Sequence, residues 1–307
     1  MLDERCKLTV FTATYNRAHL IERLYHSLQR QANFDFEWLV IDDGSTDNTA
    51  VLFEKWQKEN NPFLIRYYRQ ENRGLIRTLN RGVELAKGEY FAKIDSDDYV
   101  VDDFTKNLTI WLEQIAGSSD VYAVSGMRIT PDGNPLKGVW PAIPDGTFYV
   151  DATDLERGKY NLDADMCEAW RTDVLRRYPF PVWEGEKFAP EQIVFHEIAL
   201  AGLKIRWFPV EMSVCEYQQG GLTLGASKLE AQNPMGYAMM YNHMLKHKVG
   251  IRERLRAAMQ CNALSFVGKH PEYILKSNDL MLSIIMLVPG WILSFRRKRQ
   301  HKEVLRG

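Results

Sequence analysis

Carboxylates follow one apolar segment of the chain directly. Residues 90–94 read Tyr-Phe-Ala-Lys-Ile, which is typical of a buried strand. Asp95, Ser96 and Asp97 come next. Side chains two positions apart on a strand point the same way, so Asp95 and Asp97 can serve one site. Their oxygens suit Mg²⁺ or Mn²⁺, and phosphate oxygens can complete the coordination. We therefore expect a metal here that neutralises a diphosphate leaving group.

Two more polar clusters follow apolar segments. Asp42 and Asp43 come after Trp-Leu-Val-Ile, and their carboxylates could accept hydrogen bonds from a base N–H or a ribose hydroxyl. Tyr15 and Asn16 follow the first apolar segment and could stack on a base and hydrogen-bond to it. Each cluster also has a structural interpretation as a turn or a helix N-cap, since Asp, Asn, Ser and Thr favour both. For Asp95–Asp98 this alternative is supported by Asp102 and Asp103, which follow.

The elements that must position these clusters alternate over the first hundred residues. We expect strands at residues 8–13, 38–41, 63–68 and 90–94. We expect helices at residues 17–31 and 75–86, with another around Leu52, Phe53 and Trp56. This alternation predicts an α/β fold with a mostly parallel sheet flanked by helices. Ligands bind beyond the carboxyl ends of such strands, and all three clusters lie at such ends.

Five segments in this order resemble the inverting glycosyltransferase family 2, which has the GT-A fold. They are Thr12-Ala-Thr-Tyr-Asn-Arg17, Leu39-Val-Ile-Asp-Asp-Gly-Ser-Thr-Asp47, Glu71-Asn-Arg-Gly-Leu75, Asn80-Arg-Gly82 and Gly88-Glu-Tyr-Phe-Ala-Lys-Ile-Asp-Ser-Asp-Asp98. Each segment is weakly specific alone, whereas the five in order are highly specific. The resemblance implies a hexosyltransferase-like enzyme that uses a nucleotide-diphosphate sugar, usually a UDP-sugar.

The resemblance also implies roles for single residues. It places four residues near the base and ribose of the donor: Thr12, Thr14, Asp42 and Asp43. It places three at the ribose, the diphosphate and a Mn²⁺ or Mg²⁺ ion: Asp95, Ser96 and Asp97. Gly74 and Asn80 lie in matched segments and are expected to contact the donor as well. At Thr78-Leu79-Asn80 relatives often have Ala-Arg-Asn, so Arg77 or Arg81 would supply the missing charge.

The family also has an acid at the start of a helix, about eleven residues before a glycine and a following strand. Glu191 precedes Gly202 by that interval, so we expect Glu191 to be the catalytic base. Glu184 and Glu186, in the Glu-Gly-Glu-Lys-Phe run, are the rivals. The structural alternative for Glu191 is an acid favoured by the helix dipole.

The resemblance and the element pattern together predict two domains. Residues 1–228 would form the GT-A catalytic domain, with a nucleotide-sugar-binding half at 1–100 and an acceptor half at 101–228. In the second half we expect a strand at 121–129, a helix at 191–202 and a strand at 205–210. Residues 229–307 would form a helical C-terminal region.

The C-terminal region ends in an apolar segment, residues 280–295, and a basic tail. This segment has 16 residues, is interrupted by Pro289-Gly290, and is shorter than the roughly 20 residues of a spanning helix. We expect peripheral contact with the inner face of a membrane, where the acceptor would be a saccharide, in particular a lipid-linked one for surface polysaccharide. The alternative is a terminal helix that packs on the catalytic domain or on a second subunit.

Composition limits the remaining choices. The net charge of −1 excludes a basic footprint for nucleic acid. The four cysteines show no CxxC pair, and the N-terminal sequence lacks an apolar signal region, so we expect free thiols and a cytoplasmic chain. His243 and His247 have a spacing that suits a metal, but no HExxH pattern is present, and we expect a solvated or core role.

Three other functions compete with an inverting transferase. A sugar nucleotidyltransferase would have a glycine-rich signature after the first strand, and residues 12–17 contain no glycine. A non-catalytic sugar-binding or nucleotide-binding protein, or an assembly protein, on the same fold would bind the donor without hydrolysing it. A metal-independent transferase finds no support in the sequence.

Overall fold

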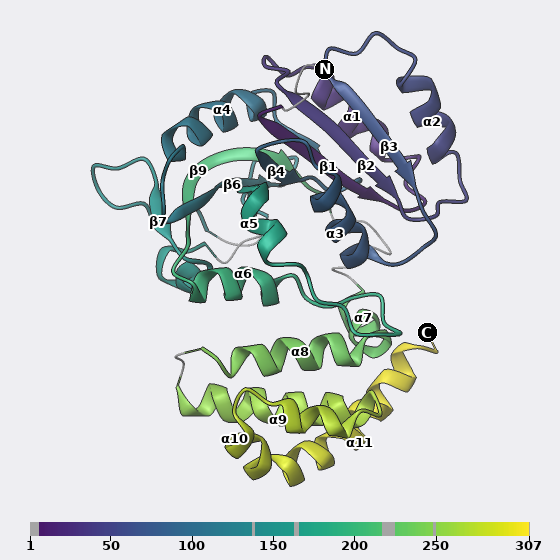
Figure 1. Cartoon of the computed structure of the whole chain (residues 1–307), viewed down its shortest axis with the longest axis vertical. Coiled ribbons are helices and arrows are strands. Elements are labelled where there is room, and N and C mark those ends of the chain that lie inside the picture. Colours follow the sequence, from purple (N-terminus) through teal and green to yellow (C-terminus); the bar gives the residue numbers. More distant parts are fainter. Residues whose placement is uncertain (1–5, 137–138, 163–165, 217–224, 248–249, 307) are drawn as a thin grey trace. The chain divides into compact units, whose positions relative to one another are not determined.

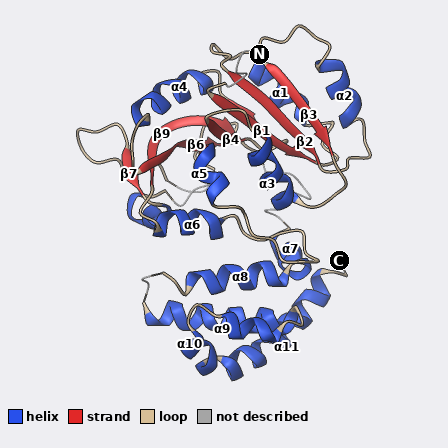
Figure 2. Ribbon diagram, viewed as in Figure 1, coloured by secondary structure: helices blue, strands red, loops and turns tan. Residues whose placement is uncertain are grey.

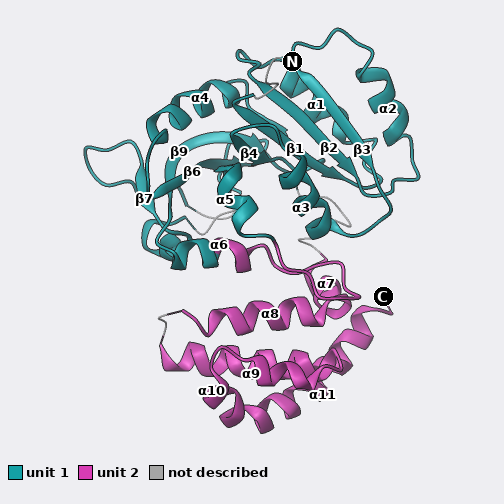
Figure 3. Ribbon diagram, in the orientation of Figure 1, with its two compact units in different colours: residues 1–179, 196–216 teal, residues 180–195, 217–307 magenta. Residues whose placement is uncertain are grey.

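The computed structural model describes residues 6–136, 139–162, 166–216, 225–247 and 250–306. The chain forms two compact units, shown in teal and magenta in Figure 3. The first contains Met1–Pro179 and His196–Glu216, and the second contains Phe180–Phe195 and Tyr217–Gly307. The domain boundary expected at residue 228 stays a prediction, and in the structure residues 180–195 group with the helical unit.

Parallel strands form one half of the sheet in the first unit. They are β1 (Leu8–Thr14), β2 (Phe36–Asp42), β3 (Leu64–Arg69) and β4 (Tyr90–Lys93), in the order β3-β2-β1-β4. β2 is buried along its whole length, as expected for a parallel strand covered on both faces. The strands predicted from the first hundred residues are therefore confirmed.

The other half of the sheet is mixed. β8 (Met166–Arg171) lies antiparallel between β4 and β6 (Val121–Ile129). β9 (Lys204–Val214) runs parallel to β6 and pairs antiparallel with β5 (Tyr99–Val100) and β7 (Val150–Ala152). The α/β fold class is confirmed, with one correction: the parallel arrangement expected for most of the sheet is found among β1–β4 and between β6 and β9, and the other pairs are antiparallel. Local periodicity does not encode the long-range pairing that inserts β8 beside β4.

Helices cover both faces of this sheet (Figures 1 and 2). α1 (Ile21–Gln29), α2 (Thr49–Trp56) and α4 (Phe104–Ile115) pack on one face, where Trp38, Trp56 and Trp111 belong to the main core. α3 (Leu75–Leu85) packs on the opposite face of β1 and β2. A Cβ atom on Gly82 of α3 would lie 2.3 Å from Cε2 of Phe11, so glycine permits this close packing.

Shorter elements complete the first unit. They are η1 (Asp154–Tyr160), α5 (Thr172–Arg177) and α6 (Gln192–Leu200), whose first residues belong to the second unit. Gly202, with φ of 84°, ends the turn after α6 and leads into β9. The predicted helix at 191–202 and strand at 205–210 are thus present, although β9 is longer than expected.

The second unit is helical after residue 225. It contains α7 (Ala226–Gln232), α8 (Pro234–Met244), α9 (Ile251–Val267), η2 (Pro271–Lys276), α10 (Leu280–Ile285) and α11 (Leu287–Val304). α8, α10 and α11 all pack against α9. No helix among the described residues combines the length and the apolar character that crossing a membrane requires.

The break in the C-terminal segment differs from the expected one. Pro289-Gly290 was expected to interrupt it, but both residues lie inside α11, and the chain changes helix at Met286. Pro289 occupies the first turn of α11, where a backbone N–H has no intrahelical partner. Its ring would clash with the carbonyl of residue 285 in a continuous helix, which explains why α10 ends there.

Candidate active site

Strands β2, β1 and β4 lie side by side and run parallel in the first unit (Figure 1), so the three polar clusters that follow them lie at one edge of the sheet. Thr14, the last residue of β1, is paired with Asp42, the last residue of β2. On the other side of β1, Ile94 donates its backbone N–H to the carbonyl of Phe11 at 2.9 Å. Asp95 therefore follows beside the end of β1. The strand order brings the clusters together, while the binding roles of their residues stay predictions.

The acids after β4 lie on a turn. β4 ends at Lys93, and the backbone N–H of Asp98 donates to the carbonyl of Asp95 at 3.1 Å. Asp95 and Asp97 therefore lie after the strand, and the prediction that strand geometry aligns their side chains is wrong. The capping alternative is also wrong, because β5 follows the turn and the side chain of Asp103, the N-cap residue of α4, makes no cap hydrogen bond.

Two cations face Asp95. Nη1 of Arg128, on β6, donates to Oδ2 of Asp95 at 3.0 Å and lies 3.5 Å from Oδ2 of Asp98. Nζ of Lys93 lies 3.4 Å from Oδ1 of Asp95. Burial alone would raise the pKa of Asp95, but Lys93 and Arg128 hold this pKa well below its usual value. Asp95 is therefore ionised at neutral pH.

The two acids that follow experience the opposite effect. Burial, and after it the negative charge of Asp95, raises the pKa of Asp97 above its usual value. The same two causes raise the pKa of Asp98 to about 7. Oδ2 of Asp98 also accepts a hydrogen bond from the thiol of Cys215 at 3.0 Å. The positive charges of Arg128 and Lys93 therefore do not fully offset the carboxylates on this turn.

Asp97 is the acid on this turn that best fits a divalent cation. Its backbone carbonyl accepts a hydrogen bond from Arg23 at 2.8 Å, which helps to fix the turn. Its half-buried carboxylate forms no ion pair within the part of the chain that the structure describes. A cation there would offset the repulsion from Asp95, and oxygen ligands suit Mg²⁺ or Mn²⁺. Asp95 fits less well, because both of its oxygens already face cations.

Sequence reasoning missed Lys93 and Arg128. Each carries a positive charge on a strand whose other residues are largely apolar, Tyr90–Lys93 and Val121–Ile129. A charge in a buried strand requires a partner, so this signal was available in the sequence. The partner of Lys93 is Asp95, two residues later in the sequence.

Asp42 is fully buried and holds its own turn. Its Oδ2 accepts the hydroxyl of Tyr67 at 2.6 Å, and its Oδ1 accepts the N–H of Ser45 at 2.7 Å. Burial and this hydrogen bond raise the pKa of Tyr67 well above its usual value, so Tyr67 remains a donor. The structural interpretation of Asp42 as a turn residue therefore has direct support.

Asp43 organises the loop before α3. Its Oδ1 accepts the N–H of Arg73 at 2.9 Å and Nε2 of Gln70 at 2.8 Å. Its Oδ2 accepts the N–H of Gly74 at 2.8 Å, and Gly74 has a φ of 89°, a conformation that favours glycine. Gln70 in turn accepts Nη1 of Arg81 at 2.7 Å. The loop around Gly74 is thus fixed to the end of β2.

This network distinguishes the two arginines proposed to supply the missing charge on α3. Arg81 joins the Gln70–Asp43 network, whereas Nη1 of Arg77 donates to the carbonyl of Arg73 at 3.3 Å. Asn80 lies half-buried on the same helix. Arg81 is therefore the arginine whose position is linked to a predicted donor-binding residue.

The loop after β1 is tied to the turn after β2. Asn16 has a φ of 53°, and its Oδ1 accepts the N–H of Thr46 at 2.8 Å while its own N–H donates to Oγ of Ser45 at 2.8 Å. Asn tolerates this left-handed conformation better than most residues. Asn16 therefore has a clear structural role, and the ring of Tyr15 beside it is 49% exposed and open to a ligand.

The two threonines of β1 differ. Thr12 is fully buried, and its Oγ1 accepts Nε1 of Trp38 at 3.1 Å, which indicates packing within the sheet. Oγ1 of Thr14 is buried and has no hydrogen-bond partner among the described residues. An unsatisfied buried hydroxyl at a strand end is consistent with a ligand contact. Ser96 is buried in the turn between Asp95 and Asp97.

Comparison with known proteins finds a related family. Residues 9–159 match the family described as "Glycosyl transferase family 2", and this range includes all three strand-end clusters. This part of the chain, just under half of its length, is therefore similar to glycosyl transferase family 2. A related sequence, the "Putative teichuronic acid biosynthesis glycosyltransferase TuaG" of Bacillus subtilis, is 31% identical over 147 residues, which cover 47% of this chain and 56% of TuaG. The first curated relatives are matched over 29% to 56% of their own lengths.

Solved structures confirm the GT-A type of fold for this chain. Staphylococcus aureus TarS 1–349, solved in complex with UDP-GlcNAc, has a TM-score of 0.59 at 18% identity and covers 98% of this chain and 91% of its own. The mannosyltransferase PcManGT from Pyrobaculum calidifontis, in complex with GDP-Man and Mn²⁺, has a TM-score of 0.56 at 18% identity, with 98% and 85% covered.

The glutamates predicted as candidates for the catalytic base all lie in the second unit. Glu191 lies directly before α6, and its carbonyl accepts the N–H of Val194 at 3.0 Å, as expected at a helix N-terminus. Glu186 is committed elsewhere, because its two carboxylate oxygens accept the N–H groups of Met235 and Gly236 at 2.8 and 2.7 Å. Glu184 is exposed on the preceding turn.

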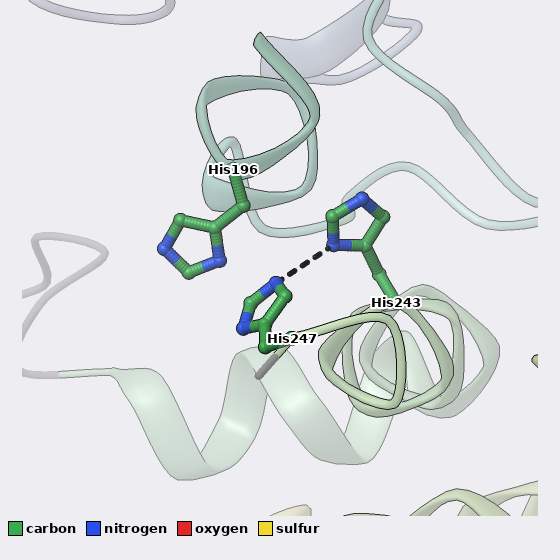
Figure 4. A group of neighbouring side chains, drawn as sticks. All are labelled: His196, His243 and His247. Atoms are coloured by element: carbon green, nitrogen blue, oxygen red, sulfur yellow. Dashed lines mark hydrogen bonds between the residues drawn. The ribbon is translucent and has the colours of Figure 1, made fainter. Parts of the chain in front are cut away.

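The histidines noted in the sequence are buried. His243 and His247 are 7% exposed each, and their ring nitrogens lie 3.3 Å apart (Figure 4). The solvated role expected as one alternative is therefore wrong for this pair, and the core role is supported. In the first unit, Nε2 of His196 lies 3.3 Å from Oδ2 of Asp154. The four cysteines are free thiols, as predicted.

Proposed function

We propose that this glycosyl transferase moves a sugar from a UDP-sugar to a hydroxyl of a saccharide acceptor, with inversion at the anomeric carbon and with Mn²⁺ or Mg²⁺ bound. The observation that carries the proposal is the meeting of the β1, β2 and β4 ends, which puts Thr14, Asp42 and Asp97 at one edge. The TarS complex with UDP-GlcNAc supports the choice of a uridine donor on this fold.

The donor half would bind the nucleotide through groups that are already ordered. The exposed ring of Tyr15 would stack on the base, and the unpartnered hydroxyl of Thr14 would hydrogen-bond to base or ribose. Asp42 and Asp43 would fix the surrounding turns, and a carboxylate lone pair can accept one further N–H or O–H. Gly74 and Asn80 would border the donor through the loop that Asp43 holds.

The diphosphate would lie at the turn after β4. Asp97 would hold the cation, with Asp95 as a second ligand or as a ribose contact, and Ser96 between them. When bound, the cation offsets the charge of the departing UDP. Arg128 and Lys93 would keep Asp95 ionised and in place, because both form ion pairs with its carboxylate.

Inversion needs one displacement and one base. The acceptor oxygen forms a bond to the anomeric carbon, the bond from that carbon to the UDP oxygen breaks on the opposite face, and the hydroxyl proton passes to the base. Glu191 is proposed as this base. It lies at the start of a helix, whereas both carboxylate oxygens of Glu186 already accept backbone hydrogen bonds that protonation would weaken.

The acceptor is proposed to be a lipid-linked saccharide of a surface polysaccharide, reached at the inner face of the cell membrane. The name of TuaG, which refers to teichuronic acid biosynthesis, supports this class of acceptor. Residues 1–228 would carry the transfer reaction and residues 229–307 would serve localisation. Apolar side chains exposed on α10 and α11 support that division of labour.

The Asp97→Asn variant tests the role of the turn. We expect donor hydrolysis to fall by about 100-fold or more, since one misplaced charge-stabilising group typically costs this much. Calorimetric titration of UDP with and without MnCl₂ should show metal-dependent binding in the wild type only. Asp103→Asn is the matched control, because Asp103 is an exposed acid six residues further along that makes no cap hydrogen bond.

Two results would contradict the proposal. Full activity of Asp97→Asn in the presence of EDTA would exclude the metal role. Tight UDP-sugar binding without any hydrolysis or transfer, in the presence of either metal, would instead favour a non-catalytic binding protein.

A further inference from the structure

Apolar side chains point away from the protein along α10 and α11. We define the outward stripe as Met281, Ile284, Val288, Trp291, Ile292 and Phe295, whose exposed fractions range from 50% to 71%. They are spaced by three, four, three, one and three residues, which keeps them along one side of successive helical turns. A helix of a water-exposed protein surface normally shows the reverse, with polar side chains outward.

The buried side of α11 is small or polar. Gly290, Ser294 and His301 are the buried residues of α11, whereas α10 buries Leu282 and Ser283. The carbonyl of Ser283 accepts Nδ2 of Asn262 at 2.8 Å. A Cβ atom on Gly290 would lie 2.6 Å from Cβ of Asn262, so α11 approaches α9 closely at this point. Polarity along α11 is therefore inverted relative to the protein core.

A polar network fixes this orientation at the C-terminal end of α11. Arg297 pairs with Glu230 of α7 and donates from Nη2 to Oε1 of Gln260 on α9 at 2.6 Å. Nε2 of His301 lies 3.0 Å from the same carboxylate of Glu230. Rotating α11 to bury the outward stripe would break these contacts and expose their buried partners. The stripe must therefore obtain an apolar environment from outside the unit.

Basic side chains continue from the apolar stripe. Arg296, Lys298, Arg299 and Lys302 are all exposed, in contrast to Arg297 between them. Phe295 directly precedes this group and Trp291 lies about one turn before Phe295. The two rings are in edge contact, with their centroids 4.8 Å apart. Aromatic residues favour the membrane–water interface, and Lys and Arg near the surface are attracted by anionic lipids.

We propose that the outward stripe and these four basic residues form a docking surface for an anionic lipid bilayer, with α10 and α11 lying in the plane of the interface. The inference rests on the proposed function, in which the acceptor is lipid-linked, and it identifies the surface that meets the lipid. A second copy of the chain suits the surface less well, because it would bring the same positive charge. At 18 residues and about 1.5 Å per residue, α11 would extend along the interface for roughly 27 Å.

Flotation with vesicles tests the surface on the full chain. One variant, Val288→Ser with Ile292→Ser, removes apolar contact, and another, Arg296→Gln with Lys298→Gln, removes charge. We expect the full chain to float with phosphatidylcholine vesicles that contain phosphatidylglycerol. The apolar variant should bind at least tenfold more weakly. At low salt the charge variant should bind about 25-fold more weakly, which is roughly fivefold for each basic residue. At high salt, screening should remove this difference.

The matched control is Val51→Ser, since Val51 on α2 is 63% exposed, as is Val288. Its flotation should equal that of the wild type. All four proteins should keep the same thermal midpoint, because the substituted side chains are exposed. Donor hydrolysis in detergent-free buffer should also stay unchanged, so loss of vesicle binding can be separated from failure of the proposed transferase activity.

Three results would overturn the inference. Equal flotation of the wild type and both variants would place lipid contact elsewhere. If the wild type hydrolyses donor but does not float, the proposed function stays intact and the docking surface is excluded. A wild-type dimer in sedimentation equilibrium that Val288→Ser with Ile292→Ser converts to a monomer, without any vesicle binding, would assign the stripe to a second copy of the chain.

Discussion

At the scale of single residues, the three glutamates near α6 differ in what their carboxylates already bind. Both oxygens of Glu186 hold the N-terminus of α8, and burial raises its pKa while the N–H groups of Met235 and Gly236 oppose that rise. Protonation of Glu186 would weaken those hydrogen bonds, because a neutral carboxyl is a poorer acceptor than a carboxylate. Glu191 lies directly before α6, at a helix N-terminus. The existing role of Glu186 at α8 favours Glu191 as the group that exchanges a proton during turnover.

Glu191→Gln should therefore lower kcat by about 10² to 10⁴, the range typical of a general base, and leave the Kd for UDP-sugar nearly unchanged. Steady-state kinetics and calorimetric titration measure the two effects separately. Glu184→Gln is the control on the exposed turn and should behave as the wild type. A mild effect at Glu191 beside an inactive Glu184→Gln enzyme would move the base to the preceding loop.

Residue roles at the strand ends were only partly predictable. The sequence indicates Asp95–Asp98 as a functional cluster because polar residues end an apolar segment. It does not indicate that Arg128, 33 residues away from Asp95, completes the cluster, since that contact depends on β6 and β8 entering the sheet beside β4. Lys93 was accessible to reasoning, because a charge inside a buried strand needs a partner.

At the scale of elements, α3 shows how one glycine sets a helix against a sheet. The first half of the fold could be predicted because each strand and helix there has a local apolar pattern. Glycine is unfavourable inside a helix, but the close approach of Gly82 to the Phe11 ring explains why a glycine occurs at this position. The mixed half of the sheet was less predictable, because β8 and β9 depend on pairing between distant segments.

Gly82→Ala tests the close packing of α3 on β1. Alanine gains up to about 1 kcal/mol of helix propensity, but its methyl group would overlap the Phe11 ring, and overpacking typically costs about 1–3 kcal/mol. We expect a net loss in the free energy of unfolding, measured by urea denaturation. Glu84→Ala, an exposed site on the same helix, should change stability by less than about 0.5 kcal/mol. A stabilised Gly82→Ala protein would show that the packing can relax.

At the scale of the whole molecule, positive and negative charges nearly cancel, with a net charge of −1. The pH dependence of stability should therefore come from individual buried groups rather than from overall repulsion. Glu168 on β8 is such a group, because burial raises its pKa from 4.5 to about 7, although Arg157 lies 3.9 Å away. Its protonated form is the one that the folded state favours.

Because the folded pKa lies above the unfolded value, this favourable contribution is complete below pH 4.5 and is lost as the pH rises through 7. The Glu168→Gln variant has no carboxyl group at this position, so it should not lose stability in this way as the pH rises. Relative to the variant, the wild type should become less stable between pH 5 and pH 8 by at most about 3 kcal/mol, from the size of the shift. Urea unfolding at both pH values measures the difference, with the exposed Glu113→Gln as control. A constant difference across this range would exclude a raised pKa.

The inverted polarity of α11 has a consequence for how its sequence can vary. Folding constrains the inner positions, where Gly290 has no room for a side chain and Arg297 and His301 share one carboxylate. The outer positions are free of that constraint, so a library selected for folded protein alone should accept polar residues at Val288 and Ile292 readily. A library selected in living cells for the product of the proposed transfer should reject them. The two selections would thus conserve opposite faces of one helix, and comparing them would separate the residues needed to fold from those needed at the cell boundary.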